Sequence, residues 1–194
     1  MTTITKTKNN TTSSKQTVKE LPVNPFIFEI LDVVSKQRSN AKKVELLKKY
    51  EDSSLKAIFI WNFDESLVSA LPEGDVPYAS TSEQNSFSGT VSDKVRDAVG
   101  KMNEMGSSSL GMNDQGRSTI RKEYKMFYNF IRGGNDGLSS LRRETMFINI
   151  LQGLHPLEAE ILILVKDKKL ETKYKITKEI VAEAYPDIKW GNRV

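Results

Sequence analysis

The sequence predicts an all-α protein: a single compact multi-helix domain with a long irregular insertion and a disordered N-terminal tail. Two observations indicate this fold. Apolar residues recur at helical spacing in most segments between residues 24 and 186. Residues that favour helix caps, such as Ser, Thr, Asn and Asp, stand where many of these segments begin. The one run that resembles a strand, ILILV at 161–165, would have no partner strand.

Three helices are expected in the first part of the domain. Asn24 suits an N-cap and Pro25 the first position of a helix that continues to Lys36. A second helix opens at Ser39 or Asn40 and ends near Tyr50. A third follows Ser53 as LKAIFIWNF, and a short turn or helix, DESLVSAL, ends before Pro72.

Order is expected to return after residue 117. The run IRKEYKMFYNFI spaces Ile120, Tyr124, Phe127 and Ile131 as one helical stripe, and GGNDG ends it. LRRETMFINILQGL predicts the next helix, and Pro156 begins another with LEAEILILVKDK. Thr177 caps a final helix, which Pro186 ends.

The domain therefore covers residues 23–190, preceded by a disordered basic tail at 1–22. The tail is polar and has no periodicity, with four lysines and one glutamate in its first twenty residues. Residues 72–117 are predicted to be a flexible insertion, because they are rich in Gly, Ser and Asn. Within them only SDKVRDAVGKMNEM, residues 92–105, has a helical pattern. Irregular segments of this length are commonly functional loops or disordered.

Composition excludes several kinds of chemistry. The chain has no cysteine, which excludes disulfides and thiolate sites, and its single histidine, His155, is expected to cap a helix. The acids Asp64, Glu65, Glu73 and Asp75 have no spacing that fixes a metal. No nucleophile–base pair emerges, so we expect no enzyme, cofactor or metal. Neither a membrane-spanning run nor a signal peptide is found, and we expect a cytoplasmic protein.

Cations are concentrated in two parts of the chain. The net charge is +4, yet residues 117–143 hold seven basic residues against two acids, and residues 166–178 hold six lysines against two acids. Separation of this kind is typical of proteins that bind polyanions, although lysines at this density can also form an ordinary solvated surface.

The first basic stretch surrounds RGGNDGLSSLRRE, residues 132–144. Its glycines need only form a hinge between two helices. Arg142 and Arg143, however, stand in the first turn of a helix, where acids are preferred. The pattern favours a phosphate contact there, with Arg132 nearby, unless Asp136 or Glu144 pairs with the arginines. GGNDG matches neither a P-loop nor a dinucleotide-binding loop.

The second basic stretch is KDKKLETKYK, residues 166–175. Lys168, Lys169, Lys173 and Lys175 could follow a nucleic-acid backbone, with Tyr174 against a sugar or base. Lysines that only complement a helix C-terminus are the alternative. We predict that Arg142, Arg143, Lys168 and Lys169 lie on one continuous surface, with the insertion elsewhere.

Two segments resemble phage-type ATP-dependent DNA ligases. NPFIFEILDVVSKQRSNAKKVELLKKYEDSSLKAIFIWNFDESL is similar to the opening of their N-terminal helical DNA-binding domain. LSSLRRETMFINILQGLHPLEAEILILVKDKKLETKYKITKEIVAEAYP resembles the last part of that domain. The resemblance implies DNA-backbone contacts for Arg142, Arg143, Lys168 and Lys169. The ligases' catalytic motif KxDG is absent, so ligase activity is not implied. In place of the family's glycine-containing turn, this chain has a longer one at Lys173–Lys175. The whole chain is also similar to an uncharacterised family of small marine tailed-phage proteins.

Two functions follow as expectations. The first is a non-catalytic module that contacts the phosphate backbone of double-stranded DNA, working in phage DNA replication or repair in the host cytoplasm. The alternative is a protein-interaction adaptor that docks on a phage or host replication or transcription protein through the insertion or the tail. A virion component is a further possibility.

Overall fold

The protein is described here by a computed structural model that covers residues 21–76, scattered positions from 90 to 100, and residues 117–191. Residues 1–20 of the predicted tail and most of the predicted insertion lie outside these residues. In chain order the helices are α1 (Ile27–Ser35), α2 (Asn40–Lys49), α3 (Ser53–Phe63), α5 (Ile120–Glu123), the 3-10 helix η2 (Tyr124–Phe130), α6 (Ser140–Gly153), α7 (Pro156–Lys166), α8 (Leu170–Lys173) and α9 (Lys178–Ala184).

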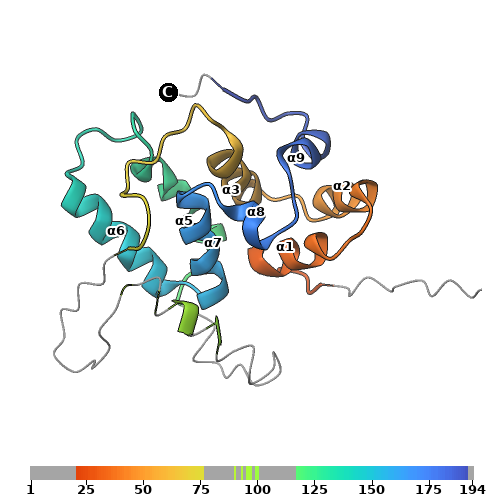
Figure 1. Ribbon diagram of the computed structural model, residues 1–194, viewed down its shortest axis with the longest axis horizontal. Coiled ribbons are helices and arrows are strands. Elements are labelled where there is room, and N and C mark those ends of the chain that lie inside the picture. The colour runs from red at the N-terminus through yellow and green to blue at the C-terminus, as the bar shows by residue number, and fades with distance from the viewer. Residues whose placement is uncertain are drawn as a thin grey trace, which may run out of the picture.

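The predicted all-α class is confirmed. Within the ranges just given no strand forms, and the only strand-like pairing there is an isolated bridge between Ser69 and Ile131. Figure 1 shows an elongated arrangement with α1, α2 and α9 at one end, α6 at the other, and α3 and α7 between them. None of these helices is both long and apolar enough to cross a bilayer.

Helices α2 and α9 pack against each other although they are far apart in the chain. α2 buries Val44 and Leu47, and α9 buries Ile180 and Val181, each on one face. The hydroxyl of Tyr185, which follows α9, donates a hydrogen bond of 2.7 Å to the backbone carbonyl of Leu47. Amphipathic faces and one buried polar contact therefore fix α9 against α2.

Helix α3 forms the centre of the core. It is apolar around most of its circumference, as expected of a helix that is surrounded by others. α7 packs along it, and the Trp61 ring lies 5.2 Å from the Phe127 ring and 6.1 Å from the Phe130 ring, centroid to centroid. The residues described before the insertion and those described after it thus share one hydrophobic core.

A buried carboxylate and a guanidinium join the beginnings of three helices. Glu158 on α7 accepts hydrogen bonds from the backbone N–H of Ile27 (3.1 Å) and of Ile120 (2.9 Å). Arg121 donates to the carbonyl of Pro25 and pairs with Asp52, the N-cap of α3. These groups satisfy helix-terminal amides that would otherwise be buried without partners.

The same contacts correct the predicted start of the first helix. α1 begins at Ile27, with Phe26 as its N-cap, instead of at Pro25 after Asn24. Arg121 holds the Pro25 carbonyl, and the Glu29 side chain accepts from the Phe26 N–H at 2.8 Å. Residues distant in the sequence therefore decide where this helix begins.

The predicted helix at 120–131 is also different in detail. It is a single turn of α-helix, α5, followed by the 3-10 helix η2. Three residues per turn place Phe127 and Phe130 on the same face, and both are buried against Trp61. Tertiary packing of two aromatic rings thus replaces the predicted α-helical stripe.

The described beginning of the predicted insertion is attached to the core. The buried Lys166 ammonium donates to the carbonyls of Pro72 (2.8 Å) and Gly74 (2.9 Å), and Val76 is buried. The positions described between 93 and 100 are helical, and Val95 and Val99 are buried as well. These parts of 72–117 therefore belong to the folded domain.

Candidate nucleic-acid interface

Arg143 has a structural role in the loop between η2 and α6. Its guanidinium donates to the carbonyls of Asn129 (2.8 Å), Asn135 (2.8 Å) and Leu138 (3.1 Å), closing the glycine-rich loop onto the helix. Three carbonyl partners leave few of its donors for a phosphate. The sequence-predicted phosphate contact therefore loses one of its two arginines.

The glycines of the same loop are explained by its geometry, as the hinge alternative requires. Gly133 has a φ of +79°, which favours glycine. A Cβ on Gly134 would lie 2.0 Å from the Tyr128 carbonyl oxygen, closer than any side chain tolerates. Both glycines therefore serve the turn itself.

Arg132 and Arg142 remain exposed. Arg132 contributes its backbone N–H to the Val68 carbonyl at 2.9 Å, beside the isolated bridge. Arg142 lies at the start of α6, where Ser139 caps the helix by accepting from the Arg142 N–H at 3.4 Å. Neither Asp136 nor Glu144 forms an ion pair with the loop arginines among the described residues.

In the second basic stretch, Lys168 is exposed, but its ammonium is held by a backbone carbonyl of the segment after α3. It adopts a φ of 55° between α7 and α8, and its ammonium donates to the backbone carbonyl of Asp64 at 2.5 Å. Burial lowers the pKa of Lys168, and the nearby carboxylates Asp64 and Glu65 partly offset this. Lys169 next to it is exposed.

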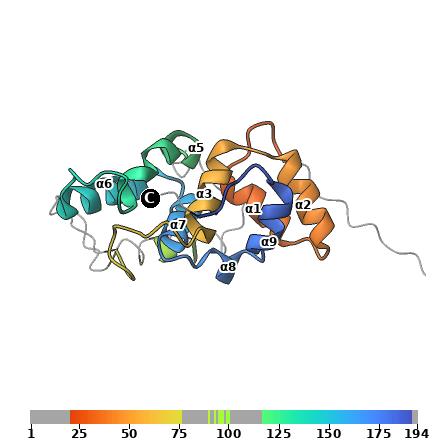
Figure 2. The same cartoon turned by 90° about the horizontal axis from the view of Figure 1, so that it is seen from above.

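The two predicted junctions do not lie beside each other. Arg142 and Arg143 belong to the first turn of α6, and Lys168 and Lys169 directly precede α8. Figures 1 and 2 both show α6 at one end of the molecule and α8 near its middle. The predicted continuous surface of these four residues is therefore not formed. The number of residues between the two junctions did not show how far apart they lie in the folded protein.

Lys173 and Lys175 are both exposed, and Lys175 lies against the N-terminal helices. The backbone N–H of Lys175 donates to the Ser35 hydroxyl at 3.1 Å, and the buried Lys43 ammonium donates to the Lys175 carbonyl. Lys173 pairs with Glu160. Tyr174 between them is 4% exposed, so it cannot stack on a base as predicted, and its burial raises its pKa.

These contacts reveal cations that the sequence reading did not select. The connection between α1 and α2 carries Lys36 and Arg38, and the first turn of α2 carries Lys42, all exposed. The sequence did contain a signal for these cations. The segment SKQRSNAKK has four cations and no acid around a helix cap, and Arg142 and Arg143 likewise stand next to a cap. We call the exposed set on the α1–α2 connection, in the first turn of α2 and at or just after the end of α8 the basic face: Lys36, Arg38, Lys42, Lys173 and Lys175.

The start of α2 adds to the positive potential of the basic face. Ser39 is the N-cap but makes no side-chain capping bond, and the first turn contains no acid. The first amides of a helix have no partner within it and carry partial positive charge. Lys36 is paired with Asp32 at 2.6 Å, whereas Arg38, Lys42 and Lys175 have no carboxylate partner in the described part of the chain.

Other candidate positions have structural explanations. His155 caps α7, its Nδ1 accepting from the Leu157 N–H at 3.1 Å, as predicted, and its ring stacks 4.7 Å from that of Phe28. Asp64 accepts from the N–H of Ser66 (3.0 Å) and of Gly191 (3.0 Å). In residues 21–76, 117–191 and the positions described between them, no three acids or histidines are grouped as metal ligands.

The chain matches a known protein family. It is described as a family of unknown function, DUF6433, and it matches residues 30–99 and 97–172. No curated protein and no solved structure matches.

Proposed function

This chain belongs to DUF6433, a family of unknown function, and from its own surface we propose that it binds the phosphate backbone of duplex DNA. The binding site is the basic face, in place of the two junctions considered from the sequence alone. The observation on which the proposal depends is the contact of Lys175 with Ser35 and Lys43, which joins cations from two distant parts of the chain.

Two properties of the basic face suit a phosphate strand. Arg38, Lys42 and Lys175 are exposed and lie beside the first turn of α2, where backbone amides add positive potential. Phosphate contacts need only charge and donors, whereas reading a base requires side chains that reach into a groove. Since Tyr174 is buried, the basic face has no described aromatic side chain for stacking, and we expect little sequence preference.

The decisive measurement is the salt dependence of duplex DNA binding. Each phosphate contact contributes a slope of about −0.9 to the logarithm of the binding constant against the logarithm of salt concentration. The triple variant Arg38→Gln, Lys42→Gln, Lys175→Gln should bind more weakly at low salt. Its slope should be shallower by about two to three units, because three contacts are lost.

A matched control removes three exposed cations elsewhere: Arg117→Gln, Lys122→Gln, Lys125→Gln. Figure 2 shows α5, which carries Lys122, on the opposite side of the molecule from α8. The control should keep most of the wild-type slope. Equal losses in both variants, an unchanged slope in the first, or tighter binding to single strands than to duplex would each reject the proposal.

A role of this binding in phage DNA replication or repair in the host cytoplasm is part of the proposal, and its support is the resemblance given above. The adaptor function is a second candidate. The sequence-based adaptor hypothesis placed the docking site on the tail or the insertion, and residues 1–20 and most of the insertion lie outside the described residues. An apolar groove beside α6 favours an adaptor that docks through α6 instead.

A further inference from the structure

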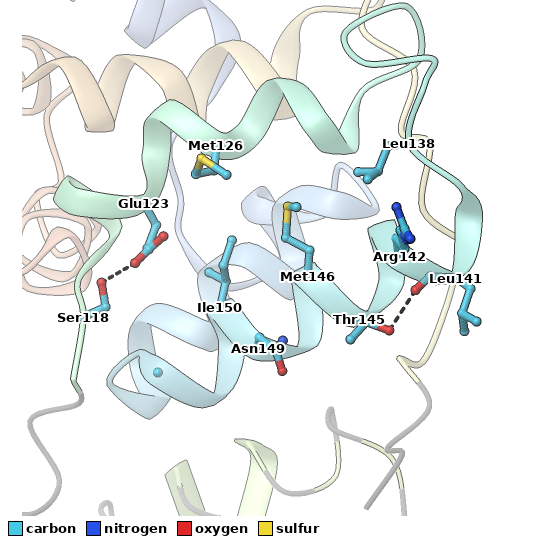
Figure 3. A pocket seen from close by; sticks show the side chains of 11 residues that line it. Ser118, Glu123, Met126, Leu138, Leu141, Arg142, Thr145, Met146, Asn149 and Ile150 are labelled. Atoms are coloured by element: carbon cyan, nitrogen blue, oxygen red, sulfur yellow. Dashed lines mark hydrogen bonds between the residues drawn. The ribbon is translucent and has the colours of Figure 1, made fainter. Parts of the chain in front are cut away.

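Helix α6 has apolar side chains on two faces. Phe147, Ile148 and Leu151 face the core. On another face Leu141, Met146 and Ile150 line a groove of about 650 Å³, together with Met126 of η2 and Leu138. Figure 3 shows Met126 pointing from η2 toward Met146 and Ile150 on α6. Met146 and Ile150 are half-buried against the core, whereas Leu141 and Met126 are exposed, so this second apolar face is only partly covered.

The dimensions of the groove match a helix. Its lining follows α6 from Leu141 to Gly153, about 18 Å at a helical rise of 1.5 Å per residue. Leu141 is 76% exposed and Met126 is 37% exposed. Methionine side chains adapt their shape to different partners and are frequent in grooves that receive helices. Several polar residues also line the groove, but Ser118 donates to Glu123 and Thr145 donates to the Leu141 carbonyl, which leaves few polar groups to orient a small ligand.

The charge at one end of the groove indicates which helix fits. Arg142 lines the groove at the start of α6, is exposed, and pairs with no carboxylate among the described residues. The first turn of α6 contains no acid that would balance the positive end of the helix dipole. At the other end Glu123 accepts from the Ser118 hydroxyl at 2.5 Å.

We propose that this groove receives an amphipathic helix of a partner protein, with apolar side chains at i, i+4 and i+7 and an acidic residue that pairs with Arg142. The groove is a docking site separate from the basic face. The start of α6 lies at the other end of the molecule from α2 in Figures 1 and 2. The two sites can therefore be occupied together.

The test uses the full chain and a labelled helical peptide with leucines at i, i+4, i+7 and i+11 and a glutamate one turn before the first leucine. A second peptide carries lysine in place of that glutamate. Wild-type protein should bind the glutamate peptide about tenfold more tightly, and Arg142→Glu should reverse this preference. Leu141→Glu should weaken both peptides at least tenfold.

Val23→Glu is the matched control, because Val23 is also an exposed aliphatic residue, at 97%, and does not line the groove. It should leave peptide affinity unchanged. If Leu141→Glu proves unfolded by circular dichroism, Thr145→Lys replaces it, since Thr145 is exposed and also lines the groove.

Four outcomes would overturn the proposal: no peptide binding, equal affinity for both peptides, a loss of affinity in Val23→Glu as large as in Leu141→Glu, or binding that is insensitive to Leu141→Glu. Sedimentation that shows a dimer lost in Leu141→Glu would assign the groove to a second copy of the chain. Peptide binding only after residues 101–116 are replaced by a Gly–Ser linker would assign it to the chain's own segment. Either assignment also rejects a partner helix.

Discussion

Several lysine and arginine side chains donate hydrogen bonds to backbone carbonyls of their own chain. Lys43, Lys166 and Lys168 donate to carbonyls that are distant in the sequence, and Arg143 donates to one carbonyl of η2 and two of the loop that follows it. A run of cations in a sequence does not show which of them bind inward. Arg143 and Lys168 therefore spend side-chain donors on their own chain, whereas Lys175 contributes only backbone groups to such contacts.

The role of Arg143 leads to a prediction about stability. Arg143→Gln should lower the free energy of unfolding by about 1–3 kcal/mol, because charged hydrogen bonds to partly buried carbonyls are lost. Arg142→Gln is the neighbouring control, and as a change at an exposed position it should alter the free energy by less than about 0.5 kcal/mol. Urea denaturation of both variants measures the difference. Similar values for the two would show that the carbonyls are satisfied by water instead.

At the scale of the element, caps and periodicity predicted most helices well. Ser39, Thr177 and Pro156 mark the starts of α2, α9 and α7 as expected. The predictions were wrong at α1 and at residues 120–131, where Arg121, Glu158 and the Trp61 ring override local preference. Cap residues and periodicity therefore predicted helix ends correctly where no distant residue contacts the backbone at that end.

The cap of α7 can be separated from the ring stacking of its histidine. His155→Asn keeps an N-cap acceptor for the Leu157 N–H, whereas His155→Ala removes it, and both lose the stacking on Phe28. The alanine variant should therefore be less stable than the asparagine variant by about 1 kcal/mol. Thermal unfolding of the pair measures this, and equal midpoints would mean that the cap contributes nothing.

At the scale of the whole molecule, Glu158 connects three distant parts of the chain. Its carboxylate lies on α7 and accepts from the starts of α1 and α5. Burial raises the pKa of Glu158, although the two N–H donors and Arg121 act in the opposite direction. The sequence shows only a glutamate in the first turn of a helix, and nothing in it reveals the two amides.

Glu158→Gln should destabilise the protein by about 1–3 kcal/mol, because the amide nitrogen presents a donor to a buried N–H. The raised pKa means that the folded state holds the proton more tightly than the unfolded state. The advantage of the wild type over the variant should therefore be complete below the ordinary glutamate range. It should shrink as the pH rises through the raised pKa. Urea titrations of both proteins across this range measure it, and a difference that grows with pH would contradict the direction.

The bond between Lys43 and the Lys175 carbonyl spans 132 residues. On a translating ribosome, α1 and α2 emerge long before Lys175 and α9, so the part of α2 that packs against α9 stays uncovered until α9 arrives, although α1 already packs against α2. A nascent chain that stops short of Lys175 would thus expose Val44 and Leu47 to chaperones. Its basic face would also be incomplete, because Lys175 would be missing from it.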